Sequence, residues 1–115
     1  MFMPTLEDIA IVYGSDATVV TNPEPGLERR VLATNERLML VEHRMKKGWV
    51  GAAHAHPHEQ VVYVVSGRLR ISAGGQTFEI GKGDSFVVRG GIEHQASALE
   101  ESEVLDVFTP RREDY

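Results

Sequence analysis

Apolar and polar residues alternate with a period of two along much of this chain, which is the pattern of half-buried β-strands. The alternating runs are short, and glycine-rich turns separate them at regular intervals. No stretch has the 3.6-residue period of an amphipathic helix. The pattern therefore predicts an all-β protein with enough strands for two small sheets, packed face to face or closed as a barrel.

Eight strands are predicted after a polar segment, residues 15–27, whose prolines and glycine indicate a loop. Their expected ranges are 28–33, 37–46, 60–65, 68–73, 76–80, 85–88, 93–98 and 103–109. Before the loop, residues 9–14 form a short β-rich run. This run is either an opening strand or an arm donated to a partner subunit.

The strand over residues 37–46 carries a histidine on an otherwise apolar face. One face of this strand consists of Met39, Val41, His43 and Met45, and the other of Leu38, Leu40, Glu42 and Arg44. Such a histidine suits the lining of a pocket. It equally suits the end of a core face.

The last strand has a comparable anomaly, because Val104, Asp106 and Phe108 share one face. A carboxylate among apolar residues is costly unless it is paired or functional. Near a cation inside a barrel, Asp106 would be suited to moving a proton. The alternatives are an ion pair with Arg111 or Arg112, or a place at the barrel rim.

Residues 48–60 hold three of the five histidines. His54 and His56 are two residues apart, so both imidazoles point to one side of an extended chain and can converge on a metal ion. The alternative is an exposed histidine-rich loop that binds no metal. His58 and Glu59 are expected to be solvated or to support the ligands rather than to act as ligands.

Composition narrows the function classes. A chain of 115 residues is too short for two cores, so residues 1–115 are predicted to form one domain. The net charge is −5 with scattered Lys and Arg, which disfavours a nucleic-acid partner. No apolar run approaches the roughly 20 residues that cross a membrane. There is no cysteine and no signal-peptide pattern, so a cytoplasmic location is predicted.

Glycines and polar residues recur at two sets of fixed intervals. The first set, in residues 48–67, is Gly48, His54, His56, Gln60 and Gly67. The second set, in residues 83–98, is Gly83, Arg89, Gly91 and His94. Together they resemble the two motifs of the cupin superfamily. The chain departs from the usual motif in having Gln60 where Glu is usual, Arg89 for Pro and Ala98 for Asn.

The resemblance implies an RmlC-like jelly-roll β-barrel that is usually a homodimer. It also implies a metal site formed by His54, His56, Gln60 and His94. Three imidazoles and an amide oxygen suit a divalent transition metal ion such as Zn, Ni, Mn, Fe or Co. The neutral Gln60 would leave the ion a stronger Lewis acid than Glu would, and it would weaken metal affinity.

A narrower resemblance rests on His-Pro-His-Glu-Gln at 56–60 and on the segment 106–112, which is similar to a motif of the pectin-degradation cupins. These proteins convert unsaturated uronates to their linear keto form. The resemblance implies that Asp106, Phe108 and Arg112 line the active site. From its sequence context alone, Phe108 is expected to pack in the barrel. Arg112 either grips a substrate carboxylate with its planar fork or belongs to a solvated tail.

Two other functions are compatible with the same residues. One is a cupin that binds a small molecule without turnover, and the other is a cupin dioxygenase. A neutral residue at position 60 argues against the dioxygenase, because non-haem iron oxygenases use a carboxylate ligand. For any of these functions, residues 9–13 are a candidate for exchange between the subunits of a homodimer.

Overall fold

The computed structural model describes residues 8–15 and 19–115 of the chain. Nine antiparallel β-strands make up the regular structure of these residues, which confirms the all-β prediction. The strands are β1 (Val20–Glu24), β2 (Leu27–Thr34), β3 (Met39–Met45), β4 (Glu59–Ser66), β5 (Arg68–Ala73), β6 (Gln76–Gly81), β7 (Ser85–Val88), β8 (His94–Ala98) and β9 (Ser102–Thr109). None of the described residues form a helix long and apolar enough to cross a lipid bilayer.

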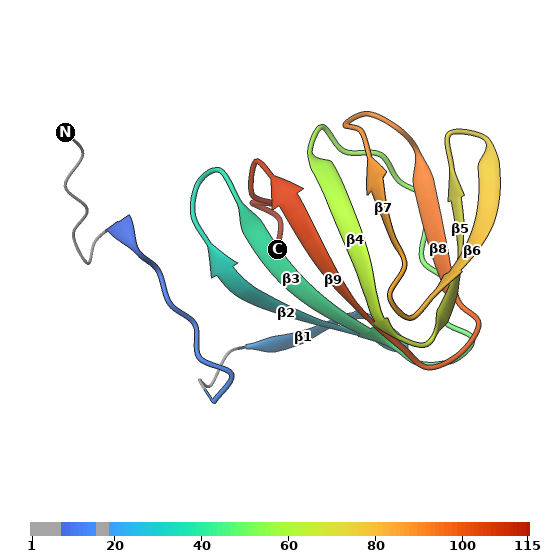
Figure 1. Cartoon of the computed structure of the whole chain (residues 1–115), viewed down its shortest axis with the longest axis horizontal. Helices are drawn as coiled ribbons and strands as arrows, with labels where there is room; N and C mark the ends of the chain where they lie inside the picture. Colours follow the sequence, from blue (N-terminus) through green and yellow to red (C-terminus); the bar gives the residue numbers. More distant parts are fainter. Residues whose placement is uncertain (1–7, 16–18) are drawn as a thin grey trace.

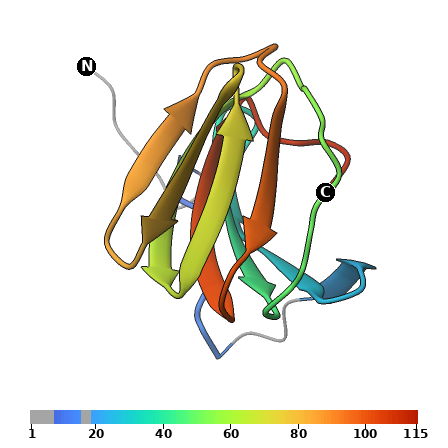
Figure 2. The same cartoon turned by 90° about the vertical axis from the view of Figure 1, so that its right-hand side faces the viewer.

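The strands form two sheets that enclose a common interior. The larger sheet has the order β1-β2-β3-β9-β4-β7, and the smaller has the order β6-β5-β8. The smaller sheet faces one end of the larger one, which gives the jelly-roll architecture (Figures 1 and 2). β9 lies between β3 and β4 in the larger sheet, so residues distant in sequence face the same interior.

The period-two alternation corresponds to the inner and outer faces of the sheets. In β3 the inward residues Met39, Val41, His43 and Met45 are all buried, as the pattern predicts. The apolar interior consists of two clusters. The larger contains Leu27, Met45, Val62, Val64, Leu69, Ile71, Ile80, Ala98 and Val104, and the smaller contains Met39, Val41 and Phe108.

The predicted loop at residues 15–27 is wrong in one part, because β1 lies within it. β1 pairs only with β2 and is the edge strand of the larger sheet. An edge strand tolerates the proline at position 23. Four of its five residues are exposed and the fifth is half-buried, so it has no alternation for a sequence pattern to reveal.

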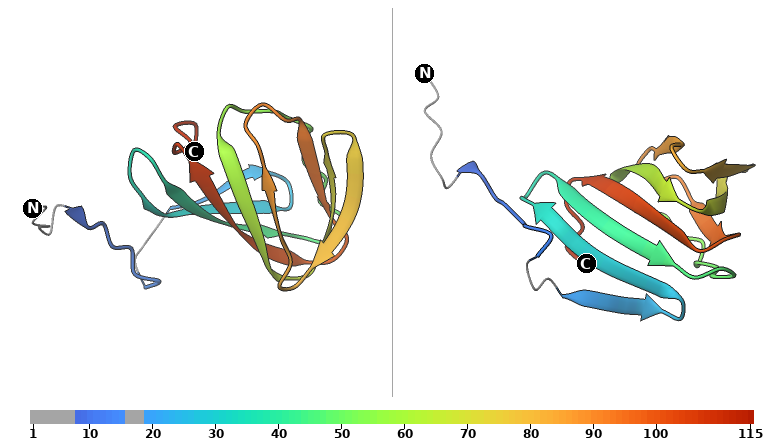
Figure 3. Two further views of the ribbon diagram at one scale, coloured as in Figure 1. Left: turned by 45° about the horizontal axis from the view of Figure 1, so that its top comes forward. Right: turned by 60° about the horizontal axis from the view of Figure 1, so that its bottom comes forward.

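The run at residues 9–13 does not form a strand within the chain. It lies outside the two sheets, beside the end of the larger sheet where β2 leads into β3 (Figure 3). Its apolar side chains are exposed, with 58% of Ile9 and 61% of Ile11 accessible to solvent. The expectation of an opening strand is therefore wrong, whereas exchange with a partner subunit stays a prediction.

Candidate metal centre

Three histidines converge where β4 and β8 begin, at one end of the space between the sheets. His54 and His56 come from the loop between β3 and β4, and His94 is the first residue of β8. Their ring centroids are 4.4–5.4 Å apart. One nitrogen of each ring lies within 4.8 Å of the others. The structure thus brings together the three histidines that the two sequence motifs single out.

Backbone hydrogen bonds join the two loops that carry these histidines. His54 and His94 form an antiparallel bridge, in which each amide donates to the other's carbonyl at 2.9–3.0 Å. The amide of Gly91 donates to the carbonyl of His56 at 2.8 Å. At Gly90 the approach is so close that a Cβ atom would lie 2.2 Å from the carbonyl oxygen of Pro57. The glycine is therefore needed for the loops to meet.

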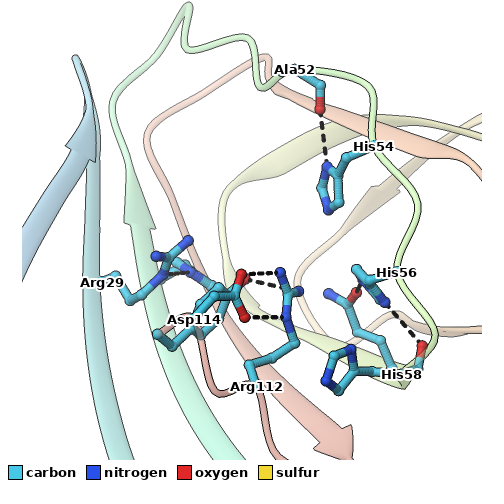
Figure 4. Close-up of polar contacts among 10 residues, drawn as sticks. Arg29, Ala52, His54, His56, His58, Arg112 and Asp114 are labelled. Carbon is cyan, nitrogen blue, oxygen red and sulfur yellow. Dashed lines mark hydrogen bonds and ion pairs between the residues drawn. The ribbon is translucent and has the colours of Figure 1, made fainter.

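The hydrogen bonds of the imidazole rings fix which nitrogen is available to a metal. The Nδ1 atoms of His54, His56 and His94 each lie 2.8–3.0 Å from a backbone carbonyl oxygen (Figure 4 shows the first two). A carbonyl only accepts hydrogen bonds, so Nδ1 carries the proton and Nε2 keeps its lone pair. His94 Nε2 is buried without a hydrogen-bond partner among the described residues.

Electrostatics also favours the neutral imidazole that metal binding requires. Burial is the main reason that the pKa values of His56 and His94 lie below the ordinary value for histidine. The positive charge of Arg112 lowers both pKa values further. His54, which completes the group, is exposed to solvent. The two buried rings are thus kept unprotonated, in the form that binds a metal ion.

Gln60 adds an amide oxygen next to the three histidines. Its Oε1 lies 3.1 Å from Nε2 of His56, and its Nε2 donates to Oδ1 of Asp106 at 2.8 Å. With the tautomer given above, Oε1 and the His56 nitrogen are both acceptors. Two acceptors at this distance repel each other unless a cation contacts both. The unpartnered His94 nitrogen and this acceptor pair fit a divalent cation at the site.

Asp106 is the buried carboxylate of the site, with 3% of its surface exposed. Its Oδ2 lies 2.6 Å from Nδ1 of His43, and its Oδ1 accepts the hydrogen bond from Gln60. The alternatives of an ion pair with Arg111 or Arg112, or a place at the rim, are wrong. The carboxylate instead lies inside, next to one of the predicted metal ligands.

His43 is both a core-face residue and a pocket residue, so the two alternatives for it do not exclude each other. It is 8% exposed and lines the cavity described below. Its Nε2 accepts a hydrogen bond from Nε of Arg29 at 3.0 Å. An arginine always donates, so the proton of the neutral His43 ring is on Nδ1 and is donated to Asp106. Arg29 thus fixes the tautomer of His43.

Arg112 does not belong to a solvated tail, because it is only 8% exposed. Its Nε and Nη2 donate to the two carboxylate oxygens of Asp114 at 3.0 and 2.8 Å (Figure 4). Its guanidinium carbon lies 4.4 Å from the ring centroid of Tyr115 and 5.2 Å from that of Phe108. The hydrogen bonds to Arg112 hold the pKa of Asp114 below its ordinary value.

Phe108 is fully buried and packs edge-to-face against His56 at 5.9 Å between ring centroids. It is not among the residues that line the cavity. Its position therefore agrees with the sequence-based expectation of packing. Phe108 contacts the His56 ring without lining the cavity. His58 likewise supports the site, since its backbone carbonyl accepts the Nδ1 hydrogen of His56.

A single cavity of about 350 Å³ connects these groups. Its polar lining includes Arg29, His43, His54, Gln60, His94, Asp106, Arg112, Asp114 and Tyr115, and its apolar lining includes Leu27, Met45, Val62, Leu69, Ile71 and Val104. The volume lies in the range of small-molecule sites, about 300–1,000 Å³. A ligand in the cavity would contact His54 and His94 together with Asp106 and His43.

Three residues of this site are absent from the sequence-based prediction. Arg29 shares the inner face of β2 with Leu27, and it is paired with His43 in the sheet. An arginine on an otherwise apolar face is the same signal that identifies Asp106, so it was available in the sequence. Asp114 and Tyr115 follow the last strand without any periodic pattern, and no signal for them was present.

A jelly roll with a cluster of three histidines at one end of its interior defines a class of metal-site β-barrels. Comparison with known proteins agrees with this class. The family model described as "Cupin domain" matches residues 41–108. The chain belongs to the cupin family, as the two motifs predict.

Similar proteins narrow the relationship. The chain is 32% identical over 92 residues to the pectin degradation protein KdgF of Dickeya dadantii (strain 3937). The matched residues make up 78% of this chain and 84% of that protein. The structure of KdgF from Halomonas sp. matches with a TM-score of 0.84 and 34% identity over 91% of this chain and 96% of that one. An RmlC-like cupin from Shewanella frigidimarina NCIMB 400 matches with a TM-score of 0.85 and 36% identity over 90% and 93%.

Proposed function

We propose that this chain is a metal-dependent enzyme that acts on a sugar acid, opening and ketonising a 4,5-unsaturated uronate. The observation that carries the proposal is the buried carboxylate of Asp106 in the same cavity as His54 and His94, two of the three clustered histidines. A buried carboxylate is costly to the fold, and it is a common element of acid–base catalysis. The likeness to two proteins named KdgF, one of them described as a pectin degradation protein, supports the choice of substrate class.

The metal ligands of this proposal are Nε2 of His54, His56 and His94 together with Oε1 of Gln60. The ion would be a divalent transition metal such as Zn, Ni, Mn, Fe or Co. When bound, it supplies Lewis-acid polarisation of a substrate oxygen. Because Gln60 is neutral, the four ligands leave the full charge of the ion to act on an anionic substrate.

Asp106 moves the proton in the proposed reaction, which is an isomerisation without gain or loss of atoms. The proton of the C1 hydroxyl leaves, the bond between C1 and the ring oxygen breaks, and C4 gains a proton as the C5 oxygen becomes a ketone. Asp106 accepts the first proton and delivers a proton to C4. His43 and Gln60 hold its two oxygens in place by hydrogen bonds.

Arg112 and Phe108 have supporting roles in this proposal. Asp114 holds the guanidinium of Arg112 at the cavity. Arg112 there adds positive charge for an anionic substrate, and Nη1, whose contact with the Tyr115 hydroxyl is long at 3.4 Å, is available to a substrate oxygen. Phe108 packs behind His56 and Arg112 and holds both in position.

The proposal is tested with purified, metal-containing protein and a 4,5-unsaturated uronate. The ultraviolet absorbance of the conjugated double bond should decay faster than in buffer, and the linear keto acid should accumulate. No acceleration with metal bound would overturn the enzymatic proposal. Binding of sugar acids without turnover would then favour a binding cupin. Iron content with oxygen consumption would favour a dioxygenase.

We also propose that the chain forms a homodimer through the outer face of its larger sheet. Val61, Val87 and Val107 lie side by side in register on this face and are 38–67% exposed. The exposed apolar residues of the run at 9–13 offer further surface for a second subunit. A monomer in size-exclusion chromatography with light scattering would overturn this proposal.

A single domain over residues 1–115 and a cytoplasmic location stay predictions.

A further inference from the structure

Arg29 is a fixed cation with free hydrogen-bond donors inside the cavity. Its Nε donates to His43, and its guanidinium carbon lies 3.5 Å from the ring centroid of Tyr115. These two contacts hold the plane of the guanidinium. Among residues 8–15 and 19–115, no acceptor is hydrogen-bonded to its two terminal nitrogens. A half-buried arginine that lines a cavity with unused donors is suited to an anionic ligand.

Arg112 differs from Arg29 in this respect. The side edge of its guanidinium is bound to both oxygens of Asp114, and its remaining nitrogen faces the hydroxyl of Tyr115. The carboxylate of Asp114 balances its charge within a two-point ion pair. Figure 4 shows Asp114 on one side of Arg112 and the histidines on the other, with Arg29 beyond Asp114. The edge of Arg112 best suited to a carboxylate is thus already occupied.

We propose that Arg29 is the residue that binds the carboxylate of the ligand. This inference rests on the proposed function for the class of ligand, and it names a specificity residue that the sequence motifs do not contain. The terminal nitrogens of Arg29 form a planar fork that matches a carboxylate. Because Arg29 and the metal-site residues His54, Gln60 and His94 line one cavity, a uronate held at Arg29 can present its ring oxygens to those residues.

The proposal also gives Arg29 two connected tasks. Its Nε edge fixes the tautomer of His43 and, through it, the hydrogen bond to Asp106. Its opposite end meets the ligand. The residue that recognises the acid therefore also orients the residue that moves the proton. Arg29 is a binding and positioning residue, whereas the proton transfer itself belongs to Asp106.

The test compares a charged ligand with its neutral counterpart in the metal-containing protein. Calorimetry would measure binding of D-galacturonate and of its methyl ester to wild type and to Arg29→Gln. Wild type should prefer the acid, and the variant should lose about 10- to 100-fold in affinity for the acid while binding the ester nearly unchanged. Arg29→Lys should regain part of the preference, because it restores the charge without the fork.

Two matched variants control for general effects. Arg30→Gln alters the adjacent arginine, which does not line the cavity of the histidines, and it should keep the preference of wild type. Arg112→Gln should bind more weakly but still prefer the acid. Metal content and melting temperature of each variant report on folding.

Three results would overturn the inference. They are a wild type that does not prefer the acid, an Arg29→Gln variant that loses acid and ester equally, and a preference abolished by Arg112→Gln instead. Failure of the proposed function has a different signature. In that case D-galacturonate binds with an Arg29-dependent preference, but the unsaturated uronate is not converted.

Discussion

The two ends of the space between the sheets have different chemistry, although the same strands supply both. β4 contributes Val64 and Val62 to the apolar cluster, and two residues earlier it contributes Gln60 to the metal site. β9 contributes Val104 to the cluster and, two residues later, Asp106. One step along the inner face of a strand thus separates a residue of the apolar cluster from a residue of the candidate site. Substitutions at the two ends should therefore affect different measurements.

The largest expected effect is on catalysis at the polar end. Asp106→Asn should reduce turnover of a 4,5-unsaturated uronate about 100- to 10,000-fold, because the group proposed to move the proton is lost. Metal content should remain, since the histidine nitrogens are unchanged. The matched control is Glu103→Gln on the same strand, whose ion pair with Arg44 lies on the outer face. Equal losses in both variants would contradict the assignment of Asp106.

A cavity at the apolar end should affect stability instead. Leu69 is 2% exposed, and Leu69→Ala should lower the free energy of unfolding by about 2–5 kcal/mol. Metal affinity of the folded protein should be unchanged, because no metal-site residue moves. Leu38→Ala, at a position 54% exposed, should change stability by less than about 0.5 kcal/mol. Denaturant unfolding and metal titration together test this separation.

Removing the metal from the polar end should lower the stability of the whole fold, because a ligand that binds only the folded chain stabilises it. A chelator should lower the free energy of unfolding by about 2.7 kcal/mol when the free metal had been at 100 times its dissociation constant. The effect arises because only the folded chain brings the histidines of the two loops together. His94→Ala should melt at the same temperature with and without the chelator. A wild-type melting temperature that ignores the chelator would contradict metal binding at this site.

The smallest expected effect concerns the contact between the two loops. In Gly90→Ala the added methyl group must displace the carbonyl of Pro57, which precedes Gln60 by three residues. We expect metal affinity to fall about tenfold, as for other changes that misplace a ligand indirectly. Gly14→Ala is the control, because a Cβ atom there meets nothing within 4 Å. Titration with a coloured metal such as Co²⁺ would measure the difference.

The sequence predicts the fold and the centre of the site because both depend on short-range patterns. Alternation places His43 and Asp106 inward, and motif spacing brings His94 to His54. Two other features depend on tertiary contacts that no local pattern records. β1 is recognisable only from its pairing with β2. The partnership of Arg112 with Asp114 requires knowing that the chain after β9 folds back over the cavity.

The hydrogen bond from Gln60 to Asp106 has a consequence for the evolution of this site. A Glu at position 60 would put two carboxylates 2.8 Å apart, and one of them would have to keep a proton at neutral pH. The amide of Gln60 avoids this conflict, because it donates to the carboxylate of Asp106 and leaves its oxygen for the proposed metal ion. Among related chains, positions 60 and 106 should therefore vary as a pair, with an acid at either position but not at both.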